Sequence, residues 1–424
     1  MNIAITNVCN RRCPFCYQSK IMENAKNSGG TEISLENFLH VIDFIIKSGE
    51  HKLHMVGGEP TLHRSFAEIV RIVGENPFIH QVILFTNGEF KPSTIEPIIK
   101  YSNKFVISIN VPEPRYETGS RLKRLHNNLQ HLSLNGVPFD LSYVVSTPDF
   151  DMSFLLDYTE KYGIKSLRWA LAFPVVERAH HIVKEELKNI GRKVVSSLRM
   201  LNARGIKTYV DCPLPYCIFS DEDMGFLSRE SLSVVNWGYC GLTLEVNPDL
   251  TIKACPVQRE QERVPLSFFR NMQEMERFFF AKMSVYKANH ILFEECRDCR
   301  YYLNNRCQGG CLGYSKDKYE GMQESGISAL CSTLLSRDPH IRKLPFLKVR
   351  EDRGMHQIYS SVSQQVKSET IDGICLRLWN ELSSEPKLSS ILKGKSMEEK
   401  NAALFFIERL QRIGFVDLYL IDRN

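Results

Sequence analysis

Short apolar runs typical of β-strands alternate with longer amphipathic runs typical of helices along the first half of the chain. The first elements that this pattern predicts are a strand over 2–8, a helix over 35–48, a strand over 52–56 and a helix over 65–75. Further strands are predicted over 81–86, 105–110, 140–145 and 166–172, with helices near 93–101, 121–135 and 151–162. Six βα units predict an α/β fold with a parallel sheet, either open and doubly wound or closed into a barrel.

The pattern changes twice towards the C-terminus, which predicts three domains. A helical stretch near 182–204 and the proline-containing segment 211–217 end the first region, so we place a boundary near residue 220. Residues 240–331 then hold seven of the thirteen cysteines with little periodicity, which indicates loops folded around metal. The predicted domains are 1–220, 221–339 and 340–424.

The last predicted domain is small and mixes strands with helices. Two short strand-like runs precede a helix over 371–382, and a long helix over 396–413 is followed by an apolar run over 415–421. This order is typical of a winged-helix-like α+β domain. Residues 340–424 carry 14 Lys and Arg against 11 Asp and Glu, an excess too small to indicate DNA binding.

Composition excludes several classes of protein. The 424 residues are 43% hydrophobic, enough for a sizeable core, and the net charge of +5 gives no reason to expect nucleic acid or an anionic membrane as a partner. The N-terminus lacks a signal-peptide pattern, and no apolar run reaches the roughly 18 residues of a membrane span. We therefore expect a soluble cytoplasmic enzyme, and in a reducing compartment so many cysteines favour metal ligands over disulfides.

Three of these cysteines, Cys9, Cys13 and Cys16, lie close together in CNRRCPFC, directly after the first predicted strand. One tight loop can aim three thiolates at one point, and a [4Fe–4S] cluster held by three cysteines keeps one iron open for a ligand. The alternative is a zinc loop that takes a fourth cysteine from elsewhere. The segments Gly57-Gly58-Glu59-Pro60 and Thr86-Asn87-Gly88 follow the second and third strands, and chemistry in parallel α/β folds is placed at such strand ends.

This chain resembles the radical S-adenosylmethionine (SAM) superfamily, which has three cysteines at this spacing and an aromatic residue, here Phe15, before the third. The resemblance implies a partial (β/α)6 barrel whose [4Fe–4S] cluster cleaves SAM reductively to a 5′-deoxyadenosyl radical. It also implies that Phe15 lies beside the adenine, and that the backbone of Gly57, Gly58 and Pro60 and the Glu59 carboxylate bind the methionine ammonium. Glycine permits close backbone approach, and a carboxylate complements a cation.

The same resemblance assigns weaker matches at later strand ends. Ser108 and Asn110 in FVISIN occupy the positions that bind the SAM ribose, and Arg168 in SLRWA occupies that of a basic residue facing the SAM carboxylate. Each residue has an ordinary alternative. Serine and asparagine at strand ends are common turn formers, and Arg168 would also suit a surface ion pair.

The second group of cysteines resembles the SPASM domain, an extension of radical SAM enzymes that holds auxiliary [4Fe–4S] clusters. The resemblance assigns one auxiliary cluster to Cys240, Cys255 and Cys311. It gives no fourth ligand; we prefer Cys217 over Cys212 or an open site, and the alternative is that Cys212 and Cys217 are ordinary buried thiols beside a proline-kinked turn. The resemblance assigns the other cluster to four cysteines: Cys296, Cys299, Cys307 and Cys331. Two departures put the local loop geometry in doubt: Leu250 replaces the usual glycine, and seven residues instead of five separate Cys299 from Cys307. Cys375, on the apolar face of the 371–382 helix, is expected in the core.

Residues 340–424 resemble PqqD-like domains, which capture the leader of a ribosomally made precursor peptide by β-augmentation. This implies a radical SAM oxidoreductase that oxidises or crosslinks such a peptide, supplied with electrons by a flavodoxin- or ferredoxin-type reductant. Two other functions remain open. The chain would dehydrogenate a small molecule such as an amino sugar or cyclitol if the last domain only packs or dimerises, or it would be a non-catalytic iron–sulfur carrier or scaffold.

Overall fold

The computed structural model describes twelve segments of the chain, and the fold concerns these alone: residues 1–27, 31–174, 180–230, 240–258, 263–303, 306–319, 338–344, 347–352, 355–360, 368–371, 373–412 and 415–419. The chain divides into two compact units. The first comprises Met1–Cys212, Cys217–Val234 and Gly241–Glu276. The second comprises Pro213–Tyr216, Val235–Cys240 and Arg277–Asn424.

The first unit is built on one sheet with the order β10-β9-β8-β1-β2-β3-β4-β5-β6-β7 among the described residues. The parallel strands from β1 onwards are Asn2–Thr6, Lys52–Gly57, Gln81–Thr86, Phe105–Asn110, Phe139–Val145, Ser166–Leu171 and Lys207–Val210. On the other side of β1, β8 (Glu245–Val246) is parallel to it, and β9 (Thr251–Lys253) and β10 (Val264–Pro265) continue the sheet in antiparallel pairs. The predicted parallel sheet is confirmed.

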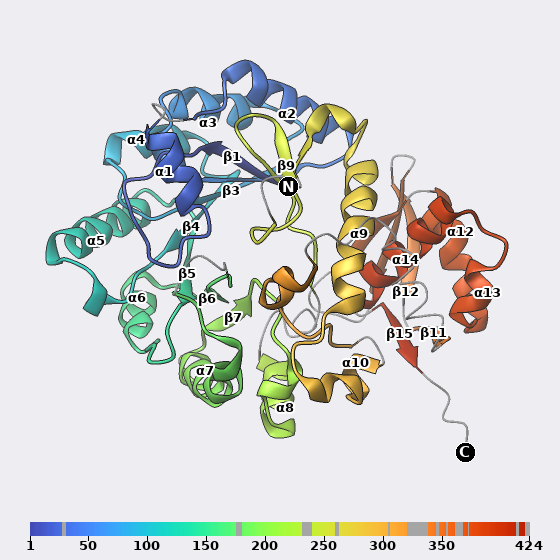
Figure 1. The fold of residues 1–424 in the computed structure, drawn as a ribbon. Helices are drawn as coiled ribbons and strands as arrows, with labels where there is room; N and C mark the ends of the chain where they lie inside the picture. Colours follow the sequence, from blue (N-terminus) through green and yellow to red (C-terminus); the bar gives the residue numbers. More distant parts are fainter. Residues whose placement is uncertain are drawn as a thin grey trace. The chain divides into compact units, whose positions relative to one another are not determined.

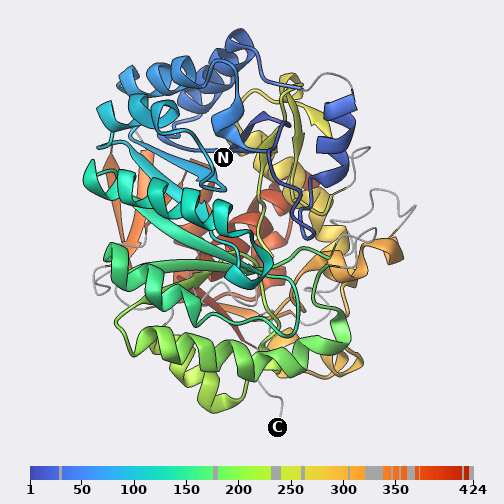
Figure 2. The same ribbon diagram turned by 90° about the vertical axis from the view of Figure 1, so that its left-hand side faces the viewer.

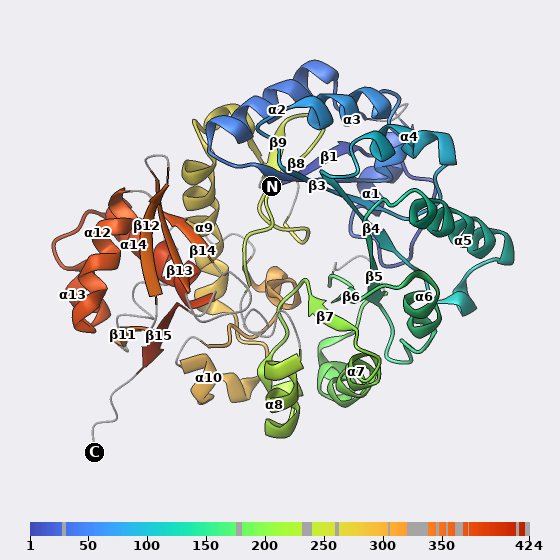
Figure 3. The ribbon, with the colours of Figure 1, turned by 180° about the vertical axis from the view of Figure 1, so that it is seen from behind.

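Helices cover the outer, convex side of this curved sheet (Figures 1 and 3). They are α2 to α7: Leu35–Lys47, Phe66–Glu75, Pro92–Lys100, Gly119–Leu134, Phe154–Tyr162 and Leu187–Asn202. Figure 2 is viewed onto this layer. Helix α1 (Ser19–Asn27) follows the cysteine loop, and α8 (Asp221–Glu230) follows the segment that contains Cys217. No described helix combines the length and the hydropathy needed to cross a membrane.

Apolar periodicity explains why these elements pack as they do. In α2 the buried side chains include Phe38, Val41 and Ile45, which share one helix face, and the Ser34 hydroxyl caps the helix by accepting the Asn37 N–H at 3.1 Å. In β3, Val82 and Leu84 are fully buried, and alternate residues such as Phe85 point to the opposite, concave face. The concave face is therefore where polar side chains of the strands gather.

The second unit begins with the larger part of α9 (Met272–Asn289), followed by α10 (Arg300–Leu303) and short 3₁₀ turns at Glu294–Arg297 and Leu312–Tyr319. It ends in a three-stranded antiparallel sheet of β12 (Leu347–Asp352), β13 (Met355–Ser360) and β14 (Ser368–Ile371). A second sheet pairs β11 (His340–Lys343) with β15 (Val416–Tyr419).

Three helices accompany these small sheets in Figure 3: α12 (Gly373–Glu381), α13 (Leu388–Leu392) and α14 (Met397–Arg412). Helix α12 packs on β13, β14 and α14, and a buried ion pair joins Lys287 of α9 to Glu408 of α14. Cys375 is half-buried, so its expected core position is wrong. The three domains proposed from the sequence remain a prediction.

A strained residue lies in the turn between β8 and β9. Leu250 has a φ of +62°, the left-handed conformation that favours glycine, and its N–H donates to the Asn247 carbonyl at 2.9 Å. The Asn247 side chain supports the turn by donating to the Thr251 carbonyl at 3.0 Å. This is the position where the SPASM resemblance expects glycine. The loop thus keeps a glycine-type backbone although its side chain is leucine.

We predict that Leu250→Gly is more stable than Leu250→Ala by about 1 kcal/mol, because both remove the leucine side chain but only glycine relieves the left-handed strain. Urea unfolding of both variants, followed by circular dichroism, measures the difference in the free energy of unfolding. An alanine variant as stable as the glycine variant would contradict the assignment of strain.

Candidate cluster and cofactor site

The cysteine loop leaves the carboxyl end of β1 and carries three half-buried thiols, Cys9, Cys13 and Cys16. The Cys16 N–H donates to the Cys13 carbonyl at 3.1 Å, and the Arg11 N–H points at Cys9 Sγ at 3.4 Å. Burial raises the pKa of Cys9 and that of Cys13 to about 11, and a neighbouring thiolate adds to each effect, from Cys13 on Cys9 and from Cys16 on Cys13. The three thiols are therefore electrostatically coupled, and a metal centre would have to displace their protons.

Within the described ranges, no three His, Cys, Asp or Glu side chains are close enough to hold a single metal ion.

The two glycines after β2 allow its end to lie directly on the start of the cysteine loop. A Cβ atom on Gly57 would lie 2.2 Å from the Thr6 carbonyl oxygen, and one on Gly58 would lie 2.2 Å from that of Val8. The Gly58 and Glu59 N–H groups donate to the same two carbonyls at 2.7 Å each. This close approach leaves no room for side chains and connects Gly57-Gly58-Glu59-Pro60 to the residue before Cys9.

Glu59 joins the ends of β2 and β3. Its side chain is buried, its Oε1 accepts hydrogen bonds from the Thr61 N–H, the Thr61 hydroxyl and the Thr86 hydroxyl, and its Oε2 accepts the Asn87 N–H at 2.8 Å. Burial raises the pKa of Glu59, and these hydrogen bonds oppose that shift. Oε1 already accepts three hydrogen bonds, so an ammonium group would approach Glu59 at Oε2. Binding of the SAM ammonium by Glu59 stays a prediction.

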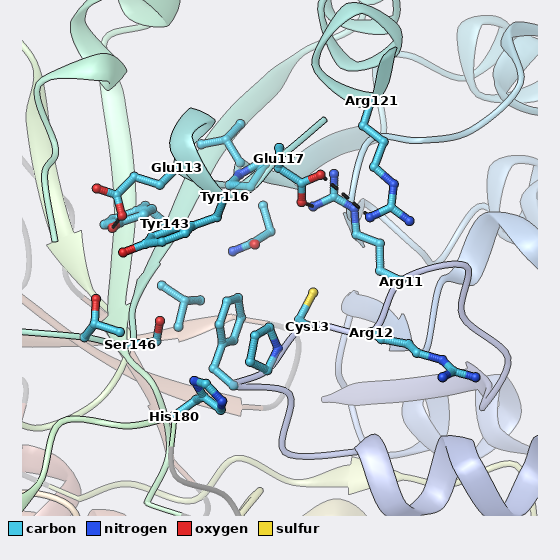
Figure 4. A pocket seen from close by; sticks show the side chains of 17 residues that line it. Arg11, Arg12, Cys13, Glu113, Tyr116, Glu117, Arg121, Tyr143, Ser146 and His180 are labelled. Carbon is cyan, nitrogen blue, oxygen red and sulfur yellow. Dashed lines mark hydrogen bonds and ion pairs between the residues drawn. The ribbon is translucent and has the colours of Figure 1, made fainter. Parts of the chain in front are cut away.

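A cavity of about 520 Å³ opens beside the loop at the carboxyl ends of β4 and β5 (Figure 4). Three of the predicted residues, Cys13, Phe15 and Asn110, line it together. Glu113 and Tyr143 lie on one side, Arg11, Glu117 and Arg121 lie on the other, and the Cys13 thiol points between them. One face of the cavity is therefore the cysteine loop itself.

The other two predicted strand residues, Ser108 and Arg168, lie on β4 and β6. In the parallel register Asn110 pairs with Ser142, and Ser142 pairs with Arg168, so the three share one row of the concave face. The Ser108 hydroxyl is buried with no hydrogen-bond partner among the described residues. The Arg168 guanidinium stacks 4.6 Å from the centroid of the Phe85 ring and lies 3.6 Å from Asp211. Their expected contacts with SAM remain predictions.

Sequence reasoning missed three buried carboxylates around this site: Glu113, Glu245 and Glu89. Glu113 accepts the Asp151 N–H at 2.8 Å and the Tyr143 hydroxyl at 3.3 Å, and it pairs with Arg115 at 3.1 Å. Its signal was its place in PEPRYE, directly after the strand that ends at Asn110.

The second missed carboxylate, Glu245 of β8, holds the segment after Cys16. It pairs with Lys253 at 2.7 Å and accepts hydrogen bonds from Gln18 at 2.9 Å and Tyr17 at 3.3 Å. No local pattern in the sequence links residues so far apart.

The predicted auxiliary ligands are divided between the two units. Cys296, Cys299 and Cys307 lie together in the second unit, where burial and then the two neighbouring thiolates raise the pKa of Cys307. Burial, followed by the nearby Cys240, raises the pKa of Cys311 to about 12. The first unit holds the remaining described candidates: Cys212, Cys217 and Cys255. Cys331 lies outside the described residues, and the grouping into two clusters stays a prediction.

Fold and site together define an α/β protein whose cysteine loop lies at the carboxyl end of the first strand of a parallel sheet. Residues 3–145 match the family model described as Radical SAM superfamily, so this part of the chain is similar to that superfamily.

Two curated relatives match a short part of the chain. The GTP 3′,8-cyclase of Klebsiella pneumoniae subsp. pneumoniae is 38% identical over 88 residues, which are 21% of this chain and 26% of the relative. The GTP 3′,8-cyclase of Cronobacter sakazakii is 35% identical over 91 residues, also 21% of this chain and 26% of the relative. The chain thus spans about a quarter of the length of these relatives.

Solved structures share the fold over a longer range. Streptococcus suis SuiB bound to S-adenosylmethionine has a TM-score of 0.53 and 15% identity, covering 73% of this chain and 72% of SuiB. SuiB bound to precursor peptide SuiA gives 0.54 and 15%, with 76% and 73% covered. Native anSMEcpe with bound AdoMet and Cp18Cys peptide gives 0.53 and 14%, with 79% and 96% covered. At these identities the likeness establishes the fold.

The superfamily implies a [4Fe–4S] cluster and SAM, and this chain's residues fit them. The loop offers three sulfur donors of the kind that bind iron–sulfur clusters, and a backbone N–H is directed at one sulfur. The cavity exposes the Cys13 thiol next to Phe15 and Asn110, and the buried Ser108 hydroxyl on the same strand as Asn110 lacks a partner among the described residues.

We predict that Glu59→Gln lowers the free energy of unfolding by about 1–3 kcal/mol, because an amide presents a donor where the carboxylate accepts four buried hydrogen bonds. The matched control is Glu68→Gln on the exposed face of α3, where the surface pair with Arg71 is screened by water and contributes little to stability. Equal losses in the two variants, measured by urea unfolding, would show that Glu59 does not join the two strand ends.

Proposed function

We propose that this chain is a radical SAM oxidoreductase that generates a 5′-deoxyadenosyl radical and uses it to oxidise or crosslink a ribosomally made peptide. The observation that carries the proposal is the cavity at the strand ends, which brings together Cys13, Phe15 and Asn110 from the cysteine loop and β4. A cluster on the three thiols would supply the electron that cleaves SAM.

The chain's own residues would hold SAM between the loop and the sheet. Phe15 would flank the adenine, Asn110 and Ser108 would bind the ribose, and Oε2 of Glu59 would accept the ammonium. Arg168 lies in the row of Asn110, where its guanidinium would complement a carboxylate. These contacts would orient the reacting carbon while the cavity walls exclude water.

Two lines of support favour a peptide over a small molecule. The fold resembles that of SuiB, solved with precursor peptide SuiA, and that of anSMEcpe, solved with Cp18Cys peptide. In the C-terminal unit, β14 is an outer strand of a three-stranded sheet with α12 packed on it. An extended peptide would add to such an edge by main-chain hydrogen bonds.

Auxiliary clusters are a further part of the proposal. Cys296, Cys299 and Cys307 are three neighbouring thiols in the second unit, and the Gly309 N–H points at Cys307 Sγ at 3.4 Å. Such a centre, completed by Cys331, would accept the second electron when the substrate radical is oxidised. Cys240, Cys255, Cys311 and Cys217 would hold the other centre.

We predict that the anaerobically reconstituted protein, given dithionite and SAM, forms 5′-deoxyadenosine, whereas Cys13→Ala forms no more than a blank without protein. Cys375→Ala on α12 is the matched control and should match the unaltered chain, since Cys375 is not a proposed ligand. Liquid chromatography with mass spectrometry measures the product. Absence of 5′-deoxyadenosine from the unaltered, iron-loaded protein would leave the carrier or scaffold alternative.

The substrate class is tested by co-expressing the chain with a candidate precursor, encoded by a short reading frame beside its gene. With the unaltered chain, we expect the peptide to lose the mass of one or more pairs of hydrogen atoms, because each oxidation or crosslink removes two. With Cys13→Ala, we expect its mass to be unchanged. An active enzyme that leaves every neighbouring precursor unchanged, but oxidises an amino sugar or cyclitol, would establish the small-molecule alternative instead.

A further inference from the structure

Arg11 lies in the cysteine loop between Cys9 and Cys13, and its side chain is buried. Its Nε donates a hydrogen bond to Glu89 Oε1 at 2.7 Å, and Nη2 lies 2.6 Å from the same oxygen as an ion pair without hydrogen-bond geometry. The two side chains are only 4% and 3% exposed. Glu89 follows β3 and is 78 residues away in sequence. Arg11, inside the predicted cluster loop, is thus paired with the segment that follows β3.

Other charges converge on this pair from α5 and the loop before it. Glu117 lies 3.5 Å from Arg11 and 3.7 Å from Arg121, and Arg121 and Arg124 lie 3.7 and 3.8 Å from Glu89. Figure 4 shows Arg11, Glu117 and Arg121 together at one wall of the cavity. Glu89 therefore keeps Arg121 and Arg124 nearby when Arg11 is replaced. For this reason an Arg11 variant should lose less stability than a variant that leaves an isolated buried charge.

The loop that carries Glu89 is itself held in place. The Asn128 side chain of α5 donates to the Gly88 carbonyl at 2.7 Å and to the Phe90 carbonyl at 2.8 Å. The Asn87 side chain donates to Asn10 Oδ1 at 2.8 Å, so the residue before Arg11 is bound to the same loop. Asn10 and Arg11 are thereby both anchored to a support built by β3 and α5.

Arg11 and its neighbour Arg12 differ only in this environment. Arg12 is exposed, whereas Arg11 is buried. A buried ion pair adds little net stability, because the loss of hydration offsets the attraction, and in some proteins such a pair instead specifies one geometry. The placement of this pair therefore points to control of loop shape rather than to global stability.

We propose that Arg11 is a positioning residue: its buried pair with Glu89 holds the segment from Cys9 to Cys13 in the shape that receives the cluster before metal arrives. The proposal rests on the proposed function, since it assumes that these thiols bind a cluster. It assigns to Arg11 no contact with SAM or substrate. Glu89 is its partner, and Arg12 has no share in this role.

The first test uses the full-length chain without metal, so that it does not depend on enzyme activity. Hydrogen–deuterium exchange across residues 9–16 should be faster in Arg11→Met and in Glu89→Gln than in the unaltered chain, and unchanged in Arg12→Met. The double variant Arg11→Met/Glu89→Gln removes both charges and so leaves neither one buried without its partner. It should fold like the unaltered chain and still exchange fast. Slow exchange in a folded double variant would overturn the proposal.

The second test measures the cluster. After anaerobic reconstitution, we expect the N-terminal cluster of Arg11→Met to bind about 10–100-fold more weakly in competition with an iron chelator, the loss typical when a residue that orients metal ligands is replaced. The SAM-induced change in the electron paramagnetic resonance spectrum identifies this cluster among any others. Arg11→Lys, which keeps the charge, should recover part of the affinity.

The outcomes separate the two proposals. If the unaltered chain gives no SAM-responsive cluster, the proposed function fails. If it gives one, and Arg11→Met retains the cluster as strongly as Arg12→Met, the positioning role of Arg11 is overturned while the proposed function stands.

Discussion

The contact on which the site depends is the close approach of Gly57 and Gly58 to the carbonyls of Thr6 and Val8. Each glycine Cβ would lie 2.2 Å from backbone oxygen, so no larger residue fits without moving one of the two strand ends. The two hydrogen bonds made across this contact determine where the chain turns out of β1 into the cysteine loop. Glu59, the next residue, extends the same support to the end of β3.

Buried carboxylates continue this support around the loop. Glu59 accepts hydrogen bonds at the strand ends, Glu89 pairs with Arg11 inside the loop, and Glu245 accepts hydrogen bonds from Tyr17 and Gln18 directly after Cys16. A buried carboxylate is costly unless donors or cations surround it. Each of these three carboxylates has such donors or cations around it, and the three sets of partners lie in different parts of the chain. The loop is therefore held at its beginning, its middle and its end.

The parallel sheet and the cysteine loop were predictable because their signals are local: apolar runs of strand and helix length, three cysteines in eight residues, and Gly57-Gly58-Glu59-Pro60 after a strand. Strands β7 and β8 were missed because they have four and two residues, too few for periodicity to register. The pairs Arg11–Glu89 and Glu245–Gln18 were missed for another reason. Nothing local distinguishes Glu89 from a solvated glutamate, and only the register of β1, β2, β3 and β8 brings these residues together.

The cavity walls bear on the proposed radical chemistry, because a carbon radical abstracts hydrogen from any weak bond it meets. Two phenols line the wall: the Tyr143 hydroxyl donates to Glu113 at 3.3 Å, and the Tyr116 hydroxyl donates to Asp149 at 3.4 Å. Glu117 is likewise paired with Arg11 and Arg121. Polar groups that bind one another do not have to be satisfied by water in the cavity. If the proposed function holds, the same pairing that holds the loop would leave the space beside Cys13 to SAM and substrate, and a substrate hydrogen would be the one to react.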